Sequence, residues 1–178
     1  VWLPDARPSR LSYWGAPQTI EVMAKAAIED QGHFETRRLV EMICEGLDSK
    51  DYTSEYLACY HFILRHTRYM RDPRRTELVK APWVIAKQIL EGRRPSIDCD
   101  ELGTLLAAMC LQLGAKVEFV TVAFAHQFYA GRRQYSHVFL RVLEPRSGVW
   151  IVFDPVAAEK TGQMLSRIKA HDVWPITS

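Results

Sequence analysis

The feature that most constrains this 178-residue chain is one segment whose pattern predicts a buried helix with a cysteine at its start. Asp98 is a favourable N-cap residue, and Glu101 three positions later completes a capping-box pattern, so the helix is expected to begin at Cys99. Gly114 ends the pattern. Between them, apolar residues recur at helical spacing: Leu102, Leu105, Leu106, Met109 and Leu113. Such a helix must be covered by other elements, and its first turn presents Cys99 to whatever lies in front of it.

The character of the chain changes after this helix. Helical periodicity before it predicts helices at about 20–30, 34–47, 54–66 and 82–91, the first of them capped by Thr19. Residues rich in Val, Phe and Thr after it predict strands at 117–124, 136–143 and 149–154, with a polar loop at 125–134. Helices followed by antiparallel strands indicate the α+β class. We therefore expect N-terminal helices and a cysteine-bearing helix packed on an antiparallel β-sheet.

The length suits one domain. We expect an extended, proline-rich N-terminal arm over residues 1–17 and a single domain over 18–178. Within that domain, the predicted helical part covers 18–114, the sheet part 115–160 and a C-terminal tail 161–178.

Composition narrows the partners. No apolar run is long enough to span a membrane, and no secretory signal pattern opens the sequence. Arginines cluster between Arg65 and Arg75, but the net charge is only +2 and arginines on a solvated helix face are common, so we expect no nucleic-acid partner. The chain has four cysteines: Cys44, Cys59, Cys99 and Cys110. They show no C-x-x-C pair and no zinc-ligand spacing, which predicts reduced thiols and a cytoplasmic location. We expect neither a metal nor a cofactor.

A hairpin is expected to bring two polar residues together. A turn at residues 145–148 pairs positions whose numbers sum to about 291–293, which places His137 opposite Asp154 or one diagonal step away on the same face. Their Cβ atoms then lie about 5–8 Å apart, close enough for a carboxylate to hold an imidazole.

Cysteine, histidine and aspartate in this arrangement suit nucleophilic catalysis. A helix N-terminus and a neighbouring imidazolium both favour the thiolate of Cys99. His137 can protonate a leaving group, and Asp154 can orient its ring. A structural interpretation stays open, because each residue alone is commonly a core or turn residue. A metal site using Cys99, His137 and an aspartate is weaker, since the histidine already needs the carboxylate.

Three motifs in order resemble the transglutaminase-like superfamily. They are Ile97-Asp98-Cys99-Asp100-Glu101, Ser136-His137-Val138 and Trp150-Ile151-Val152-Phe153-Asp154-Pro155, and the upstream segment Tyr69-Met70-Arg71-Asp72-Pro73 resembles the one that often precedes the family's cysteine. The resemblance covers roughly residues 35–160. Within the superfamily, the sequence is more weakly similar to bacterial and phage-associated members in particular.

The resemblance implies a papain-like arrangement in which Cys99 is the nucleophile, His137 the general acid/base and Asp154 the orienting carboxylate. It implies acyl transfer through a thioester, and we favour hydrolysis of a peptide or amide bond in a protein or peptide substrate over transamidation. The alternative is a non-catalytic structural or interaction module that keeps the fold, for example in a phage-like assembly. Ile97 stands where the family often has glycine and leans toward that alternative. The oligomeric state is not predicted.

Overall fold

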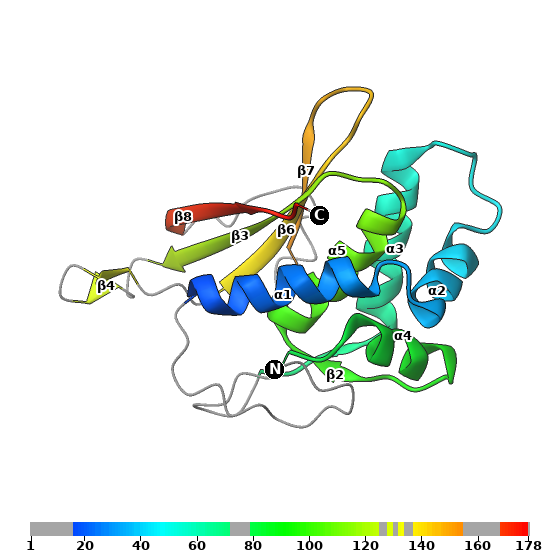
Figure 1. The fold of residues 1–178 in the computed structure, drawn as a ribbon, viewed down its shortest axis with the longest axis horizontal. Coiled ribbons are helices and arrows are strands. Elements are labelled where there is room, and N and C mark those ends of the chain that lie inside the picture. Colours follow the sequence, from blue (N-terminus) through cyan, green and yellow to red (C-terminus); the bar gives the residue numbers. More distant parts are fainter. Residues whose placement is uncertain are drawn as a thin grey trace.

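The computed structural model describes residues 16–71, 79–124, 128–129, 132–133, 137–154 and 168–177. Its helices are α1 (Ala16–Asp30), α2 (Phe34–Cys44), α3 (Tyr52–His66), α4 (Pro82–Leu90) and α5 (Cys99–Gln112). Its strands are β1 (Arg68–Tyr69), β2 (Ser96–Ile97), β3 (Val117–Phe124), β4 (Phe128–Tyr129), β5 (Arg132–Arg133), β6 (His137–Leu143), β7 (Trp150–Phe153) and β8 (Ile168–Pro175). The predicted α+β class is confirmed (Figure 1).

Helix boundaries follow local signals where those signals are strong. Asp51 caps α3, where its carboxylate accepts a hydrogen bond from the Ser54 N–H at 3.3 Å. Two boundaries were predicted wrongly. α1 begins at Ala16, so Thr19 lies inside the helix instead of capping it. α2 ends at Cys44, earlier than expected, and Gly46 just beyond adopts a φ of +84°, which a continuing helix does not allow.

The main sheet has the strand order β7-β6-β3-β8, and every neighbouring pair is antiparallel. β8 lies in the segment expected to be a tail, so the predicted end of the sheet near residue 160 is wrong. The sequence of β8 mixes charged and apolar residues without clean alternation, and its pairing with β3 supplies the missing order. The predicted loop at 125–134 also contains the short β4–β5 hairpin. The predicted strands β3, β6 and β7 are confirmed.

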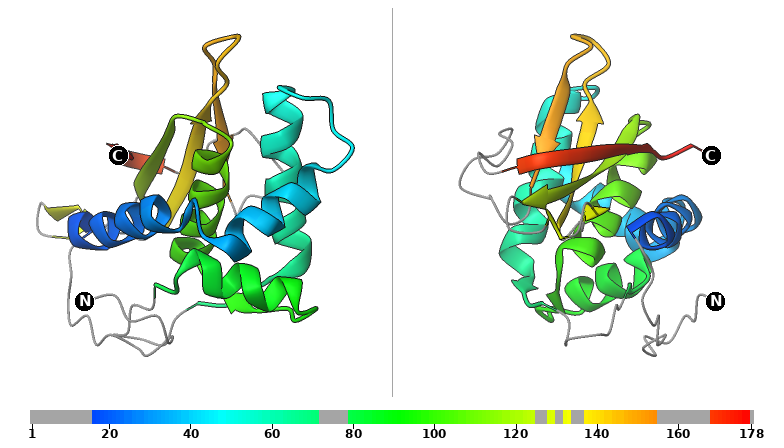
Figure 2. Two further views of the ribbon diagram at one scale, coloured as in Figure 1. Left: turned by 45° about the vertical axis from the view of Figure 1, so that its right-hand side comes forward. Right: turned by 90° about the vertical axis from the view of Figure 1, so that its left-hand side faces the viewer.

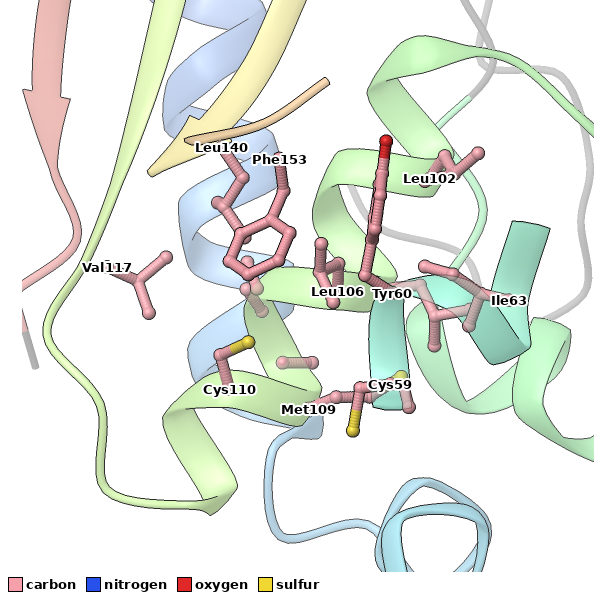
Figure 3. Packing of buried hydrophobic residues seen from close by; sticks show 14 of the residues in the cluster. Cys59, Tyr60, Ile63, Leu102, Leu106, Met109, Cys110, Val117, Leu140 and Phe153 are labelled. Carbon is pink, nitrogen blue, oxygen red and sulfur yellow. The ribbon is translucent and has the colours of Figure 1, made fainter. Parts of the chain in front are cut away.

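α5 lies where the helices meet the sheet (Figures 1 and 2). Every residue from Glu101 to Cys110 is buried, because α1, α3 and α4 cover the helix on some sides and β6 and β3 on others. In Figure 3, Leu106 and Met109 of α5 lie among side chains from both parts, including Ile63 of α3 and Leu140 of β6. The predicted apolar stripe is therefore the centre of the core. Burial of each side chain of this size stabilises the fold by about 1.5–3 kcal/mol.

Two further expectations concern membranes and thiols. No helix in the part of the chain that the structure describes has both the length and the hydrophobicity to cross a bilayer. All four cysteines are free thiols, as predicted; Cys59 and Cys110 are buried, and Cys44 is partly exposed.

Candidate active site

Cys99 is the first residue of α5, and the predicted capping box around it is confirmed. The Asp98 carboxylate accepts hydrogen bonds from the N–H groups of Asp100 at 3.0 Å and Glu101 at 3.3 Å. The Glu101 carboxylate in turn accepts one from the Asp98 N–H at 3.2 Å. Since the cap occupies the N–H groups of Asp100 and Glu101, the Cys99 N–H is the first-turn donor that the cap leaves for a substrate oxygen.

His137 and Asp154 meet through the hairpin of β6 and β7. The register pairs Leu140 with Phe153, so Asp154 faces Phe139 and His137 lies one diagonal step away, as the turn position predicted. The His137 Nε2 lies 2.9 Å from an Asp154 carboxylate oxygen, and both residues are buried, with exposed fractions of 8% and 2%. This contact orients the imidazole and leaves Nδ1 as the ring nitrogen to exchange a proton with a nucleophile.

Tyr60 supports the same corner from the helical side and was missed in the sequence analysis. Its hydroxyl donates a hydrogen bond of 2.5 Å to the backbone carbonyl of Asp154. Its ring packs beside Phe153, with centroids 5.1 Å apart (Figure 3). A tyrosine on the buried face of a predicted helix indicates that its hydroxyl needs a hydrogen-bond partner. Helical periodicity does not show that this partner is the backbone of Asp154, which follows β7 far along the chain.

The electrostatic setting of Cys99 differs from the expectation. Burial raises the pKa of the Cys99 thiol, and the charges of Asp100 and Asp98 raise it further, while a backbone hydrogen bond from Val138 lowers it. The thiol also donates a hydrogen bond to Asp100 at 3.4 Å. The expected bias toward a thiolate is therefore outweighed in the resting protein, because desolvation and two nearby carboxylates all disfavour the anion. The raised pKa favours the neutral thiol over the thiolate.

The contact with Val138 places the Cys99 sulfur against β6, beside the backbone of the residue that follows His137. The described geometry thus brings the start of α5 to the strand that carries His137, and the hairpin adds Asp154. The catalytic roles of these three residues remain predictions.

Replacing Asp100 with asparagine is expected to speed alkylation of Cys99. Asparagine removes one negative charge beside the sulfur but keeps an amide oxygen to accept the thiol hydrogen bond. The pKa of Cys99 should fall, so at any pH below that pKa the thiolate fraction rises, by about tenfold for each unit of pKa. The measurement is the rate of iodoacetamide modification from pH 6 to 10, mapped by mass spectrometry. The exposed Asp48→Asn variant serves as the control, and equal rates in both variants would contradict the electrostatic assignment.

The remaining sequence motifs are only partly described. β1 pairs in parallel with β2, so Tyr69 lies beside Ile97, two residues before Cys99. Ile97 is buried, which accounts for an apolar residue at this position. Asp72 and Pro73 of the upstream motif, Ser136 and Pro155 lie outside the described residues, as do Arg74 and Arg75 of the arginine cluster.

Among the residues that the structure describes, two carboxylates and a thiol lie close enough together to be compared with a cation site. Asp98, Cys99 and Asp100 offer ligand atoms within 4.8 Å of one another. The Asp98 carboxylate already caps α5, and the Asp100 carboxylate accepts the Cys99 thiol hydrogen bond. These contacts explain why the residues lie together, so the group carries no metal assignment.

Comparison with known proteins shows a likeness of fold. The chain matches no protein-family profile, and no curated protein matches it in sequence. It is similar to the crystal structure of a “putative protease” from Parabacteroides distasonis, with a TM-score of 0.57 and 14% identity over 80% of this chain and 27% of that one. A “putative cysteine protease” from Cytophaga hutchinsonii gives a TM-score of 0.45 and 15% identity over 98% of this chain and 56% of that one. The chain therefore spans about a quarter of the first protein and about half of the second. At 14% identity, the likeness to the Parabacteroides protein concerns the fold alone. The TM-score for the Cytophaga protein is too low to support a conclusion about this chain.

Proposed function

We propose that this protein is a cysteine-dependent acyl-transfer enzyme that most readily hydrolyses a peptide or amide bond, with a protein or peptide as its substrate. The observation that carries the proposal is the buried His137–Asp154 pair on the hairpin whose strand β6 contacts the sulfur at the start of α5. The transglutaminase-like assignment belongs to this proposal and rests on the three sequence motifs. The fold shared with the Parabacteroides protein supports a peptidase-like chemistry.

In the proposed reaction, Cys99, His137 and Asp154 keep the same roles in both halves of the cycle. The Cys99 thiol gives its proton to His137 Nδ1 as the sulfur attacks the carbonyl carbon, and the Cys99 N–H stabilises the resulting oxyanion. His137 returns the proton to the departing amine, and the C–N bond breaks to leave a thioester. Water then gives a proton to His137 and attacks the thioester carbonyl. The C–S bond breaks as His137 passes that proton to the sulfur, which releases the acid and restores the thiol. Asp154 holds the imidazole through Nε2 in both halves.

The deciding experiment measures the reactivity of Cys99 with and without His137. Cys44 must first be removed, because it is partly exposed and a hydrogen bond with the Cys59 thiol lowers its pKa, so it would compete for the reagent. In a Cys44→Ala background, the rate of trapping by a panel of peptide electrophiles is measured against pH. The His137→Ala variant is expected to react about 10²- to 10⁴-fold more slowly near neutral pH, the usual contribution of a general base.

The matched control is His66→Ala, which removes a histidine from the exposed end of α3 and should leave the rate unchanged. The enzymatic proposal fails if Cys99 behaves as an ordinary thiol with a pKa near 8.5 and reacts equally well without His137.

The second candidate is a non-catalytic structural or interaction module, for example in a phage-like assembly. The partial burial of Cys99 and the two aspartates that raise its pKa favour this candidate, because a thiol kept neutral reacts slowly. It predicts that Cys99→Ala preserves biological function. The cytoplasmic location is also a proposal, and it rests on the free thiols.

A further inference from the structure

We propose that Lys80 is a positioning residue for Cys99, an inference that rests on the proposed function. The Lys80 Nζ lies 2.8 Å from Glu101 Oε1 and donates a hydrogen bond of 3.1 Å to the backbone carbonyl of Ser96. Ser96 stands three residues before the nucleophile and Glu101 two residues after it. A single ammonium group therefore joins the chain on both sides of Cys99.

Burial makes the first of these contacts demanding. The Glu101 side chain is 1% exposed and the Lys80 side chain 25%. A buried carboxylate without a charged partner is strongly destabilising, and the Lys80 ammonium is such a partner for Glu101. The second Glu101 oxygen accepts the hydrogen bond from the Asp98 N–H, directly before Cys99. The interaction thus runs from Lys80 through Glu101 to the backbone that orients the nucleophile.

The contact with Ser96 adds what a cap alone lacks. The capping box fixes the first turn of α5 relative to its own axis, whereas Lys80 fixes that turn relative to β2 and to the segment that enters α4. The direction of the Cys99 N–H and of its sulfur then depends on Lys80. A displacement of about 1 Å at a reacting group can lower a rate about 10²-fold, so this position is one where a remote charge can control catalysis.

The test compares variants that separate charge compensation from positioning. Lys80→Met alone leaves the buried Glu101 carboxylate without its charged partner, and such a variant can fail to fold. The informative variant is therefore Lys80→Met/Glu101→Gln, in which both side chains are neutral. All variants carry Cys44→Ala. Their thermal midpoints are recorded together with the pH profile of trapping by a peptide electrophile. The matched control is Lys25→Met/Glu29→Gln, which neutralises an exposed ion pair on α1.

The double variant is expected to remain folded yet to trap the electrophile at least about tenfold more slowly, with a pH profile that differs from that of the parent. The Lys80→Arg variant keeps the positive charge and should trap the electrophile at close to the parental rate. The Lys25/Glu29 control should also match the parent. Glu101→Gln alone keeps the Lys80–Ser96 contact and should lose less than the double variant.

A folded double variant with the parental rate and pH profile would overturn the inference and leave Lys80 with a stabilising role only. That result is distinct from failure of the proposed function, in which the parent itself would show no dependence on His137.

Discussion

Replacing Cys99 with alanine is expected to abolish turnover of any amide substrate of this protein, a loss on the order of 10⁴- to 10⁶-fold. If Cys99 is the nucleophile, as proposed, no thioester can form without its sulfur, and His137 and Asp154 lose the group on which they act. Stability should change by no more than about 1 kcal/mol, because the substitution removes one atom from a partly exposed residue and leaves the capping box intact. Turnover of peptides identified by covalent trapping, together with thermal unfolding, gives both numbers.

The control for this experiment is Cys44→Ala, which removes the other partly exposed thiol and should leave turnover unchanged. Turnover that survives in Cys99→Ala would point to a different nucleophile. A large loss of stability would show instead that Cys99 is needed mainly for packing.

Replacing Phe153 with alanine is expected to lower the free energy of unfolding by about 3–5 kcal/mol. Phe153 is 1% exposed, and its ring packs on Tyr60 at the boundary between α3 and the sheet. Its loss would leave a cavity beside the tyrosine whose hydroxyl holds the backbone of Asp154. Urea unfolding measures the effect.

Val149→Ala is the control, because this residue directly precedes the same strand and is 57% exposed; its substitution should change stability by less than about 0.5 kcal/mol. Similar values for the two variants would contradict the packing of Phe153 against α3.

The sequence was most informative where structure depends on neighbours along the chain. The capping box needs only Asp98 and Glu101, three residues apart, and the helix starts where they place it. The approach of His137 to Asp154 needs only a turn of known position, because a strand repeats every two residues and the register follows.

What the sequence could not show depends on partners far along the chain. β8 lacks a clean alternation and becomes a strand because β3 offers it an edge. Tyr60 and Lys80 are recognisable as polar residues in the sequence. The groups that they bind, just after β7, in β2 and in α5, follow only from the tertiary packing. The raised pKa of Cys99 is a similar case, since burial is its main cause.

The division of the site between a helix and a later hairpin has a consequence during synthesis. The thiol at the start of α5 leaves the ribosome before the β6–β7 hairpin that positions His137 and Asp154, so a nascent chain holds the proposed nucleophile without its proposed base. The raised pKa of this thiol belongs to the complete fold, because β6 lies against the start of α5 and contributes to its burial. We expect the proposed reactivity of Cys99 to appear only when β6 and β7 have packed against the helices. The order of the elements along the chain would then delay this reactivity until the fold is complete.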